Sequence, residues 1–211
     1  MYNSRPNLYI GFHGCDEKVR DQLVTSPNSA IKMSEKPFDW LGHGFYVWEN
    51  NQERAFQWAK NKEKKREIEK ASVVGVVYVL GNCLDFTDSQ YIDVIENYYT
   101  NLKDELSQLG KSLPVNKDSE FDLFKDKLIR ELDCMVIEYM HKAIKEEITK
   151  DIGEKGYSEL KYFDSARSIF TEGGPAFEGA GIQKKNHIQI CIRNQNCIKA
   201  FFIPRNETKF P

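Results

Sequence analysis

Residues 72–80 read Ser-Val-Val-Gly-Val-Val-Tyr-Val-Leu, and they form the most strand-like stretch of the chain. A nearly continuous run of valine and tyrosine is typical of a strand that is buried on both faces. Gly81 and Asn82 follow and end the run. This stretch therefore predicts a buried strand, around which the rest of the fold can be placed.

Further strands are expected near both ends of the chain. They are rich in aromatic and β-branched residues, which suit a pleated and half-buried surface, and they are bounded by turn-forming residues. The predicted strands cover residues 8–13, 45–48, 187–193 and 197–203.

Helices are expected between these strands. Asp16 is a natural cap for a short helix that ends at Pro27-Asn28-Ser29, and Asn50 or Asn51 for a helix that runs through Lys70. Apolar residues recur at spacings of three and four over residues 88–109 and 119–150, which predicts two amphipathic helices joined by a linker around Pro114. We therefore expect one α+β domain over residues 1–211, with a mostly antiparallel or split sheet and a helical insertion at about residues 88–160.

The composition is that of a folded protein without a strong electrostatic preference. The chain has 211 residues, 40% of them hydrophobic, and a formal net charge of -2, so it has no overall attraction to nucleic acid or to an anionic membrane. The longest apolar stretch is far shorter than the roughly 18 residues of a membrane-spanning helix. The first residues lack the apolar core of a secretory signal, so we expect a cytoplasmic protein. The five cysteines form no CxxC pair, which favours reduced, mostly buried thiols over a zinc site.

Three places put polar or aromatic groups at strand ends beside glycines. They are His13-Gly14, the segment 42–46, and the glycine-rich approach to residues 187–189. A residue without a Cβ lets a ligand come close to the backbone, so each place is a candidate binding site. Taken singly, each is weak, because a histidine at a strand end is more often a hydrogen-bonded structural residue.

The order of these segments resembles the ADP-ribosyltransferase superfamily. Phe12-His13-Gly14 comes first, then Gly44-Phe45-Tyr46 before a helix with Trp58-Ala59, and finally Gln189 in a strand. The resemblance is to the branch whose three signature positions are His, Tyr and Glu or Gln, which includes poly-ADP-ribose polymerases and diphtheria-type toxins. It covers roughly residues 8–59 and 163–203 and leaves out the helical middle. It implies that NAD binds, as a substrate, in a cleft between two small sheets, and that no metal is required.

The resemblance also implies roles for individual residues. His13 would hydrogen-bond a ribose hydroxyl of NAD, and the backbone of Gly14 would hold the nicotinamide carboxamide. Tyr46 would lie against the nicotinamide ring, where an aromatic face can steady a cationic ring. Gln189 takes the third position, which contacts the ribose 2′-hydroxyl. Gly44, just before the tyrosine, belongs to the same cofactor-binding segment.

Other candidates follow from their position near this expected cleft. Arg167 can contact the pyrophosphate or the target, and Glu172 can act as a substitute acid, although an exposed or structurally paired charge is an equally good reading of each. Glu178 lies in the loop before Gln189, and His187 holds the position that sets target specificity in several relatives. His43, between two glycines, can line the entrance.

Two aromatic segments near the expected cleft have alternative readings. Phe38, Asp39 and Trp40 occupy the place where relatives carry a variable loop over NAD. Phe56 and Trp58 flank Gln57, which stands at the spacing of a second stacking tyrosine in relatives, and we expect both aromatic residues to be core residues.

The expected function is mono-ADP-ribosylation of a macromolecule, either a protein or a nucleic acid. Glutamine keeps a hydrogen bond to ribose but lacks the negative charge of glutamate, so polymer synthesis is not expected. By fold-level analogy only, such a protein acts as an intracellular toxin or defence effector, with an antitoxin as partner. Two alternatives stay open: a catalytically inactive module that binds NAD, ADP-ribose or a protein, and an NAD glycohydrolase that transfers ADP-ribose to water.

Overall fold

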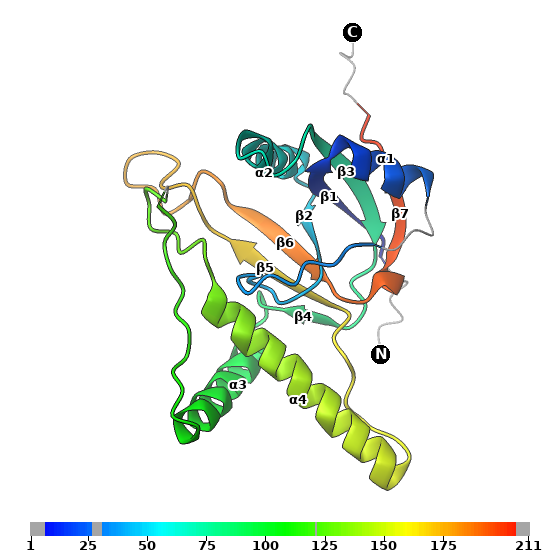
Figure 1. Cartoon of the computed structure of the whole chain (residues 1–211), viewed down its shortest axis with the longest axis vertical. Helices are drawn as coiled ribbons and strands as arrows, with labels where there is room; N and C mark the ends of the chain where they lie inside the picture. Colours follow the sequence, from blue (N-terminus) through cyan, green and yellow to red (C-terminus); the bar gives the residue numbers. More distant parts are fainter. Residues whose placement is uncertain (1–6, 27–30, 121, 206–211) are drawn as a thin grey trace.

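A mixed β-sheet forms the centre of the molecule (Figure 1). The computed structural model describes residues 7–26, 31–120 and 122–205, and within these residues the sheet has seven strands. Their order is β4-β5-β6-β2-β1-β3-β7, with β4 and β5 parallel and the other neighbours antiparallel. The strands are β1 (Tyr9–Asp16), β2 (Phe45–Glu49), β3 (Ala71–Tyr78), β4 (Cys83–Asp85), β5 (Ser165–Phe170), β6 (His187–Ile192) and β7 (Ile198–Phe202).

Four helices and one 3-10 turn accompany the sheet in the described part of the chain. The helices are α1 (Glu17–Thr25), α2 (Gln52–Lys64), α3 (Ser89–Gln108) and α4 (Glu131–Lys155), and the 3-10 turn is Gln195–Cys197. Together with the sheet they confirm the predicted α+β class. Among the described residues, no helix has the length and apolar character needed to cross a membrane.

The two faces of the sheet carry different cores. On one face, which we call the α1 face, Leu23 of α1 packs with sheet residues such as Val47, Val76 and Ile190. On the other, which we call the α4 face, residues of α4 such as Met140 pack with Leu41, Leu84, Ala166 and Cys191. Because side chains alternate along a strand, a central strand contributes to both cores. The run that predicted a strand buried on both faces forms β3, and its centre is buried as expected.

The described residues form one continuous sheet instead of the expected pair of small sheets. The junction lies between β1 and β2, which pair only at Gly11 with Glu49 and at Phe12 with Trp48. By contrast, β1 pairs with β3 along its whole length, and β2 pairs with β6 over four residues, Phe45 to Trp48. The junction is thus a narrow part of one sheet.

Two helix predictions were too long. The helix after Asn51 ends at Lys64 instead of Lys70, because Arg66 has a positive φ of 61° that cannot continue a helix. The fourth helix covers 131–155 instead of 119–150. Before it, the chain forms a loop in which Lys117 and Ile129 make an isolated bridge. The first helix ends at Thr25, and the expected stop at Pro27-Asn28-Ser29 lies outside the described residues.

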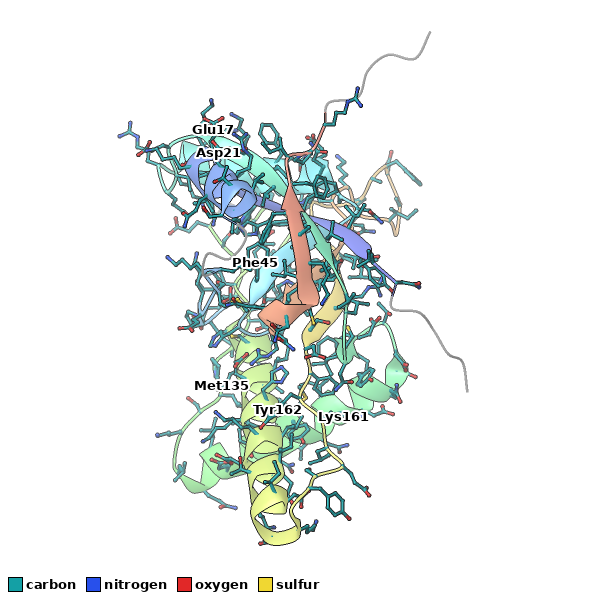
Figure 2. All side chains as sticks on the ribbon, turned by 90° about the vertical axis from the view of Figure 1, so that its right-hand side faces the viewer. Glu17, Asp21, Phe45, Met135, Lys161 and Tyr162 are labelled. Atoms are coloured by element: carbon teal, nitrogen blue, oxygen red, sulfur yellow. The ribbon has the colours of Figure 1, made fainter. Side chains whose placement is uncertain are left out.

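The helices α3 and α4 form a crossed pair beside the sheet, as Figure 1 shows. They lie in the chain between β4 and β5, which are neighbours in the sheet. Figure 2 shows the segment with Lys161 and Tyr162 running back along α4 toward the sheet. There, Asp164 accepts a hydrogen bond from the backbone of Asn82 over 2.8 Å, which ties the end of the insertion to its start.

The five cysteines are free thiols, as expected. Four are buried and Cys83 is half-buried. Burial raises the pKa of Cys15, Cys83 and Cys134 to about 11, so these thiols stay protonated at neutral pH.

Candidate functional site

His13 lies where β1 and β2 stop pairing, directly after Phe12. Its ring Nδ1 donates a hydrogen bond to the backbone carbonyl of Tyr46 over 2.7 Å. A carbonyl oxygen can only accept, so Nδ1 carries the proton and Nε2 of the neutral ring is an acceptor. Burial lowers the pKa of His13 to about 4, against the effect of this hydrogen bond, and the charge of Lys62 lowers it further. His13 is therefore neutral at physiological pH.

The glycines singled out in the sequence are required by close packing within the protein. A Cβ on Gly14 would lie 2.1 Å from the carbonyl oxygen of Ala55, because the backbone of α2 rests directly on β1 there. A Cβ on Gly44 would lie 2.5 Å from Sγ of Cys191 on β6. The space beside Gly14 and Gly44 that we expected a ligand to use is therefore filled by Ala55 and Cys191 of the protein itself.

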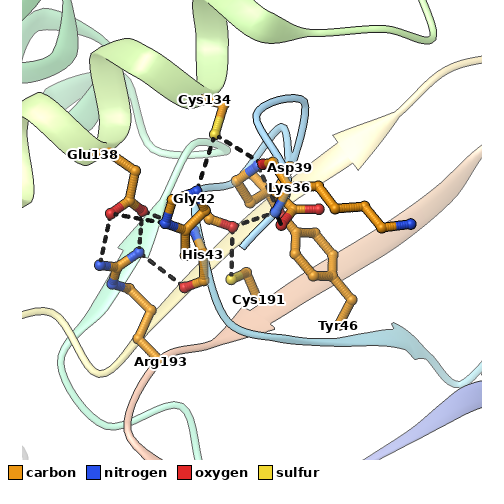
Figure 3. Close-up of polar contacts among 10 residues, drawn as sticks. Lys36, Asp39, Gly42, His43, Tyr46, Cys134, Glu138, Cys191 and Arg193 are labelled. Atoms are coloured by element: carbon orange, nitrogen blue, oxygen red, sulfur yellow. Dashed lines mark hydrogen bonds and ion pairs between the residues drawn. The ribbon is translucent and has the colours of Figure 1, made fainter. Parts of the chain in front are cut away.

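Tyr46 holds the preceding loop in place. Its hydroxyl donates to the carbonyl of Gly42 over 2.7 Å and accepts from the amide of Leu41 over 2.9 Å (Figure 3). The residue is half-buried and packs against the α4-face core. Burial, the largest cause, holds the pKa of the phenol well above its usual value of 10. Tyr46 can thus offer a ligand part of its ring, while its hydroxyl is already used.

Gln189 lies on β6 opposite Trp48 of β2. Its Oε1 accepts a hydrogen bond from the indole Nε1 of Trp40 over 2.6 Å. An indole N–H is only a donor, so this contact identifies the carboxamide oxygen and leaves the Gln189 amide nitrogen without a hydrogen-bond partner among the described residues.

The structure brings these predicted residues together only in part. Tyr46 and Gln189 occupy neighbouring strands on the same face, since Tyr46 pairs with Cys191 and Trp48 pairs with Gln189. The His13 ring packs instead on Phe45, with ring centroids 4.5 Å apart, and Phe45 belongs to the α1-face core. His13 therefore meets Tyr46 through the Tyr46 peptide, while the two rings lie on opposite faces of the sheet.

Arg167 is placed away from Tyr46 and Gln189. It pairs in register with Ile190, which belongs to the α1-face core, and its Nε lies 2.9 Å from Oε2 of Glu49. A second ion pair joins it to Asp85 over 3.0 Å. These contacts, the bond to Glu49 above all, raise the pKa of the guanidinium further. The expected pyrophosphate contact is replaced by a structural role.

The loop of residues 34–44 reaches Gln189 through Trp40, whose ring lies next to the guanidinium of Arg130 at the start of α4. The Trp40 ring meets Phe170 edge to face at 4.9 Å, and the Arg130 guanidinium lies 4.1 Å from the centroid of Phe170. Asp39 accepts from the backbone amide of Lys36 over 2.8 Å and shapes the loop, while Phe38 is exposed.

His43 anchors this loop to α4 (Figure 3). Its backbone amide donates to Oε1 of Glu138 over 2.7 Å, and its carbonyl accepts from Arg193 over 2.9 Å. Arg193 and Glu138 form an ion pair of their own. Arg193 and the amide of His43 lower the pKa of Glu138 despite its burial. The arrangement gives His43 a structural function in holding the loop.

Three buried residues and the half-buried Arg54 form a cluster that the sequence identified only in part. This Glu172 cluster consists of Trp48, Arg54, Glu172 and His187. Glu172 and His187 are each 7% exposed and Trp48 is 3% exposed. Arg54 forms an ion pair with Glu172, and the His187 ring is 6.2 Å from that of Trp48. Glu172 and His187 stood out in the sequence beside glycine-rich turns, whereas nothing local distinguished Trp48 or Arg54.

His187 is an uncharged member of this cluster. Its Nδ1 donates to the carbonyl of Lys185 over 2.7 Å, and its ring stacks on Phe170 at 5.5 Å. Burial lowers the pKa of His187 to about 4, so the ring is neutral at physiological pH. The ion pair of Arg54 and Glu172 therefore supplies the charges of the cluster.

Two donors of the cluster are buried without an acceptor. Neither Nε1 of Trp48 nor Nε of Arg54 has a hydrogen-bond partner among the described residues. An unpaired buried donor costs about 1–3 kcal/mol, so two of them in one cluster are a marked departure from ordinary core packing.

The remaining candidates take peripheral places. Glu178 is exposed in the loop before β6. Phe56 and Trp58 are 37% and 39% exposed, so the prediction that they are core residues is wrong. Gln57 lies on the same exposed part of α2 and donates to Glu53 over 3.2 Å. In the described part of the chain, no group of three or more His, Cys, Asp or Glu residues is placed to hold a metal ion.

Comparison of the chain with protein-family models, with curated proteins and with solved structures returned no match.

Proposed function

We propose that the chain is an NAD-dependent mono-ADP-ribosyltransferase that modifies a macromolecule. The observation that supports this best is the hydrogen bond between His13 and the Tyr46 carbonyl. It joins two of the three residues that the resemblance names, at the point where the central strands stop pairing. It also fixes the tautomer of His13 in which Nε2 is an acceptor, on the face of the sheet opposite to the Tyr46 ring and Gln189.

In the transfer of ADP-ribose from NAD, the main task of His13, Tyr46 and Gln189 would be to position the substrate. The bond between the ribose carbon and nicotinamide breaks, and its electron pair leaves with the neutral base. A lone pair of the acceptor then forms the new bond to the same carbon, and the acceptor loses a proton. Orientation of the sugar and electrostatic support of the oxocarbenium-like state provide the acceleration.

Gln189 limits the electrostatic stabilisation that the site can give to the oxocarbenium-like state. Its amide N–H groups can donate to a ribose hydroxyl, but the side chain brings no negative charge to the developing cation. We therefore expect slow turnover and transfer of single ADP-ribose units.

A non-catalytic module that binds NAD or ADP-ribose is the second candidate. The observation that favours it is the Trp40–Gln189 hydrogen bond, which occupies the carboxamide oxygen with a group of the protein itself. In that case the fold would retain recognition of the dinucleotide without breaking it.

Incubation of the purified chain with NAD labelled in the adenylate and with cell lysate separates these functions. Label on protein or nucleic acid supports the proposed transfer. Free ADP-ribose and nicotinamide without labelled macromolecules identify a glycohydrolase. Thermal stabilisation by NAD with neither product identifies the binding module. Absence of all three contradicts an NAD-directed function.

A further inference from the structure

The Glu172 cluster contains more hydrogen-bond donors than acceptors. Arg54 gives one N–H to Glu172, while its Nε and the Trp48 Nε1 have no acceptor among the described residues. His187 adds no charge: its Nδ1 donates to the Lys185 carbonyl, which leaves Nε2 as an acceptor. A group that brings oxygen acceptors and negative charge would satisfy both remaining donors, whereas a hydroxyl would add a donor as well.

The surroundings of Arg54 favour an anion. Arg54 is the third residue of α2, close to the positive end of a 13-residue helix whose cap is Asn51. Trp48 packs against Ala55, the next residue of the same helix, and its ring lies 6.2 Å from that of His187. Arginine and oriented N–H groups at a helix start are a common arrangement for phosphate recognition.

Glu172 occupies the place of such an anion in this structure. Its carboxylate is the acidic group paired with Arg54, and its side chain is 10% exposed. A carboxylate has two oxygens in a plane, while a phosphate presents oxygens in several directions. A phosphate can therefore reach donors that Glu172 leaves unpaired.

We propose that Arg54 and Trp48 form a binding site for a phosphate group, and that Glu172 fills this site as an internal competitor in the absence of the ligand. The proposal goes beyond the proposed function, because it requires a phosphate group and no transfer reaction. If the chain does bind NAD, the diphosphate of NAD is one source of that group.

The backbone around Glu172 is fixed independently of its carboxylate. Gly173 and Gly174 follow Glu172 with φ values of 89° and 72°. This segment is held by the Gly173 amide on Asp126 over 2.8 Å and by the Lys185 amide on the Glu172 carbonyl over 3.0 Å. Movement of the Glu172 side chain alone can open the site, because these two bonds use backbone atoms of the segment.

Calorimetric titration of the full chain with inorganic pyrophosphate, ADP and NAD tests the site. Glu172→Gln removes the competing charge and should tighten binding of pyrophosphate and ADP by about tenfold or more. The double variant with Arg54→Gln should lose binding of both. Glu178→Gln, an exposed position in the same loop, is the matched control and should bind like the wild type.

A second measurement uses the unmodified chain, in case Glu172→Gln folds poorly. The indole N–H signal of Trp48, assigned with a Trp48→Phe variant, should shift in NMR spectra when pyrophosphate is added. An unmoved signal, or equal affinities of the wild type and a folded Glu172→Gln variant, would overturn the proposal. Pyrophosphate or ADP binding without NAD turnover would support this site and contradict the proposed transferase. NAD turnover with no effect of Glu172→Gln on pyrophosphate or ADP binding would support the proposed transferase and contradict the phosphate site.

Discussion

The indole of Trp40 donates to the carboxamide oxygen of Gln189 across 149 positions of sequence, at a distance of 2.6 Å. This bond fastens the loop of residues 34–44 to β6. Tyr46 holds the same loop through its hydroxyl, so both Tyr46 and Gln189 contact residues 34–44. Any ligand that uses the Gln189 oxygen has to compete with Trp40.

Trp40→Phe should test that competition. The variant keeps an aromatic ring against Phe170 and loses the hydrogen bond, so the free energy of unfolding should fall by about 1 kcal/mol. If NAD uses the carboxamide oxygen of Gln189 in addition to the free amide N–H groups, the kcat/KM for NAD should rise because that oxygen is released. Denaturant unfolding and an NAD assay measure the two effects. Phe38→Leu, at an exposed position of the same loop, is the control. A lower kcat/KM in Trp40→Phe would mean that Trp40 itself contributes to the site.

Gln189→Ala should lower kcat for NAD by about tenfold or more and change KM less. The amide N–H groups are expected to act on the sugar as the bond to nicotinamide breaks, so their loss affects the transition state more than ground-state binding. Steady-state kinetics on Gln189→Ala, with Gln57→Ala on the exposed part of α2 as control, give the comparison. Unchanged kcat would remove Gln189 from the proposed site.

Gly14→Ala should prevent stable folding. The added Cβ would lie 2.1 Å from the Ala55 carbonyl oxygen, a backbone atom of α2 that cannot rotate away, so we expect a loss of about 3 kcal/mol or more. Gly153→Ala is the matched control, because its Cβ in α4 meets nothing within 4 Å. That variant should gain about 0.5–1 kcal/mol from helix propensity. Thermal and urea unfolding of both variants check the prediction, which fails if Gly14→Ala is as stable as the wild type.

Arg167→Gln should destabilise the chain without affecting NAD chemistry. The change leaves Glu49 and Asp85 without their cation in a largely buried place, and we expect a loss of about 2–3 kcal/mol. Lys142→Gln breaks an exposed pair with Glu146 and should change stability by less than about 0.5 kcal/mol. Turnover per folded molecule is the second readout. A large rise of KM for NAD in Arg167→Gln would restore the ligand role that the sequence suggested.

Stability should fall as the pH decreases from about 6.5 toward about 4. His13 and His187 have a folded-state pKa of about 4, against about 6.5 in the unfolded chain, so the unfolded state binds more protons in this window. Above the unfolded-state pKa of about 6.5, the two neutral histidines contribute fully to the free energy of unfolding. Below that pH, the contribution of each histidine decreases by up to about 1.4 kcal/mol per pH unit. Urea unfolding at about pH 7 and about pH 5 measures the slope. His13→Asn should reduce it, and an unchanged slope would contradict the neutral state of His13.

The parts of the fold that follow from local composition were predictable. The strands β1, β2, β3, β6 and β7 are rich in β-branched and aromatic residues, and each was expected within a few residues of its bounds. The strand β5 was not expected, because its polar residues find partners only in the tertiary structure. Ser165 bonds to the Leu80 carbonyl and Arg167 to Glu49 and Asp85. β4 has three residues and is too short to give a pattern.

Residues with an unusual local setting were easier to single out in the sequence than their arrangement in space. Glycine beside histidine marked a special backbone position at Gly14, yet the sequence could not show that α2 fills the space beside it. Likewise, Glu172 and His187 stood out as polar groups near turns. Their common neighbour Arg54 comes from a helix 118 positions away from Glu172, a separation over which no local pattern carries information.

The pairing of β1 with β2 is the shortest strand pairing in the described sheet. Among the described residues, two register pairs bridge this junction, together with the hydrogen bonds from His13 to the Tyr46 carbonyl and from the Asn50 amide to the Ile10 carbonyl, whereas the pairings of β1 with β3 and of β2 with β6 are longer. Separation of β1 from β2 would break few main-chain hydrogen bonds. The helix α2 contacts both strands and so links the two sides of the junction. The contacts of α2 with β1 and β2 therefore add to the short strand pairing in holding the sheet together at the place where His13 bonds to the Tyr46 carbonyl.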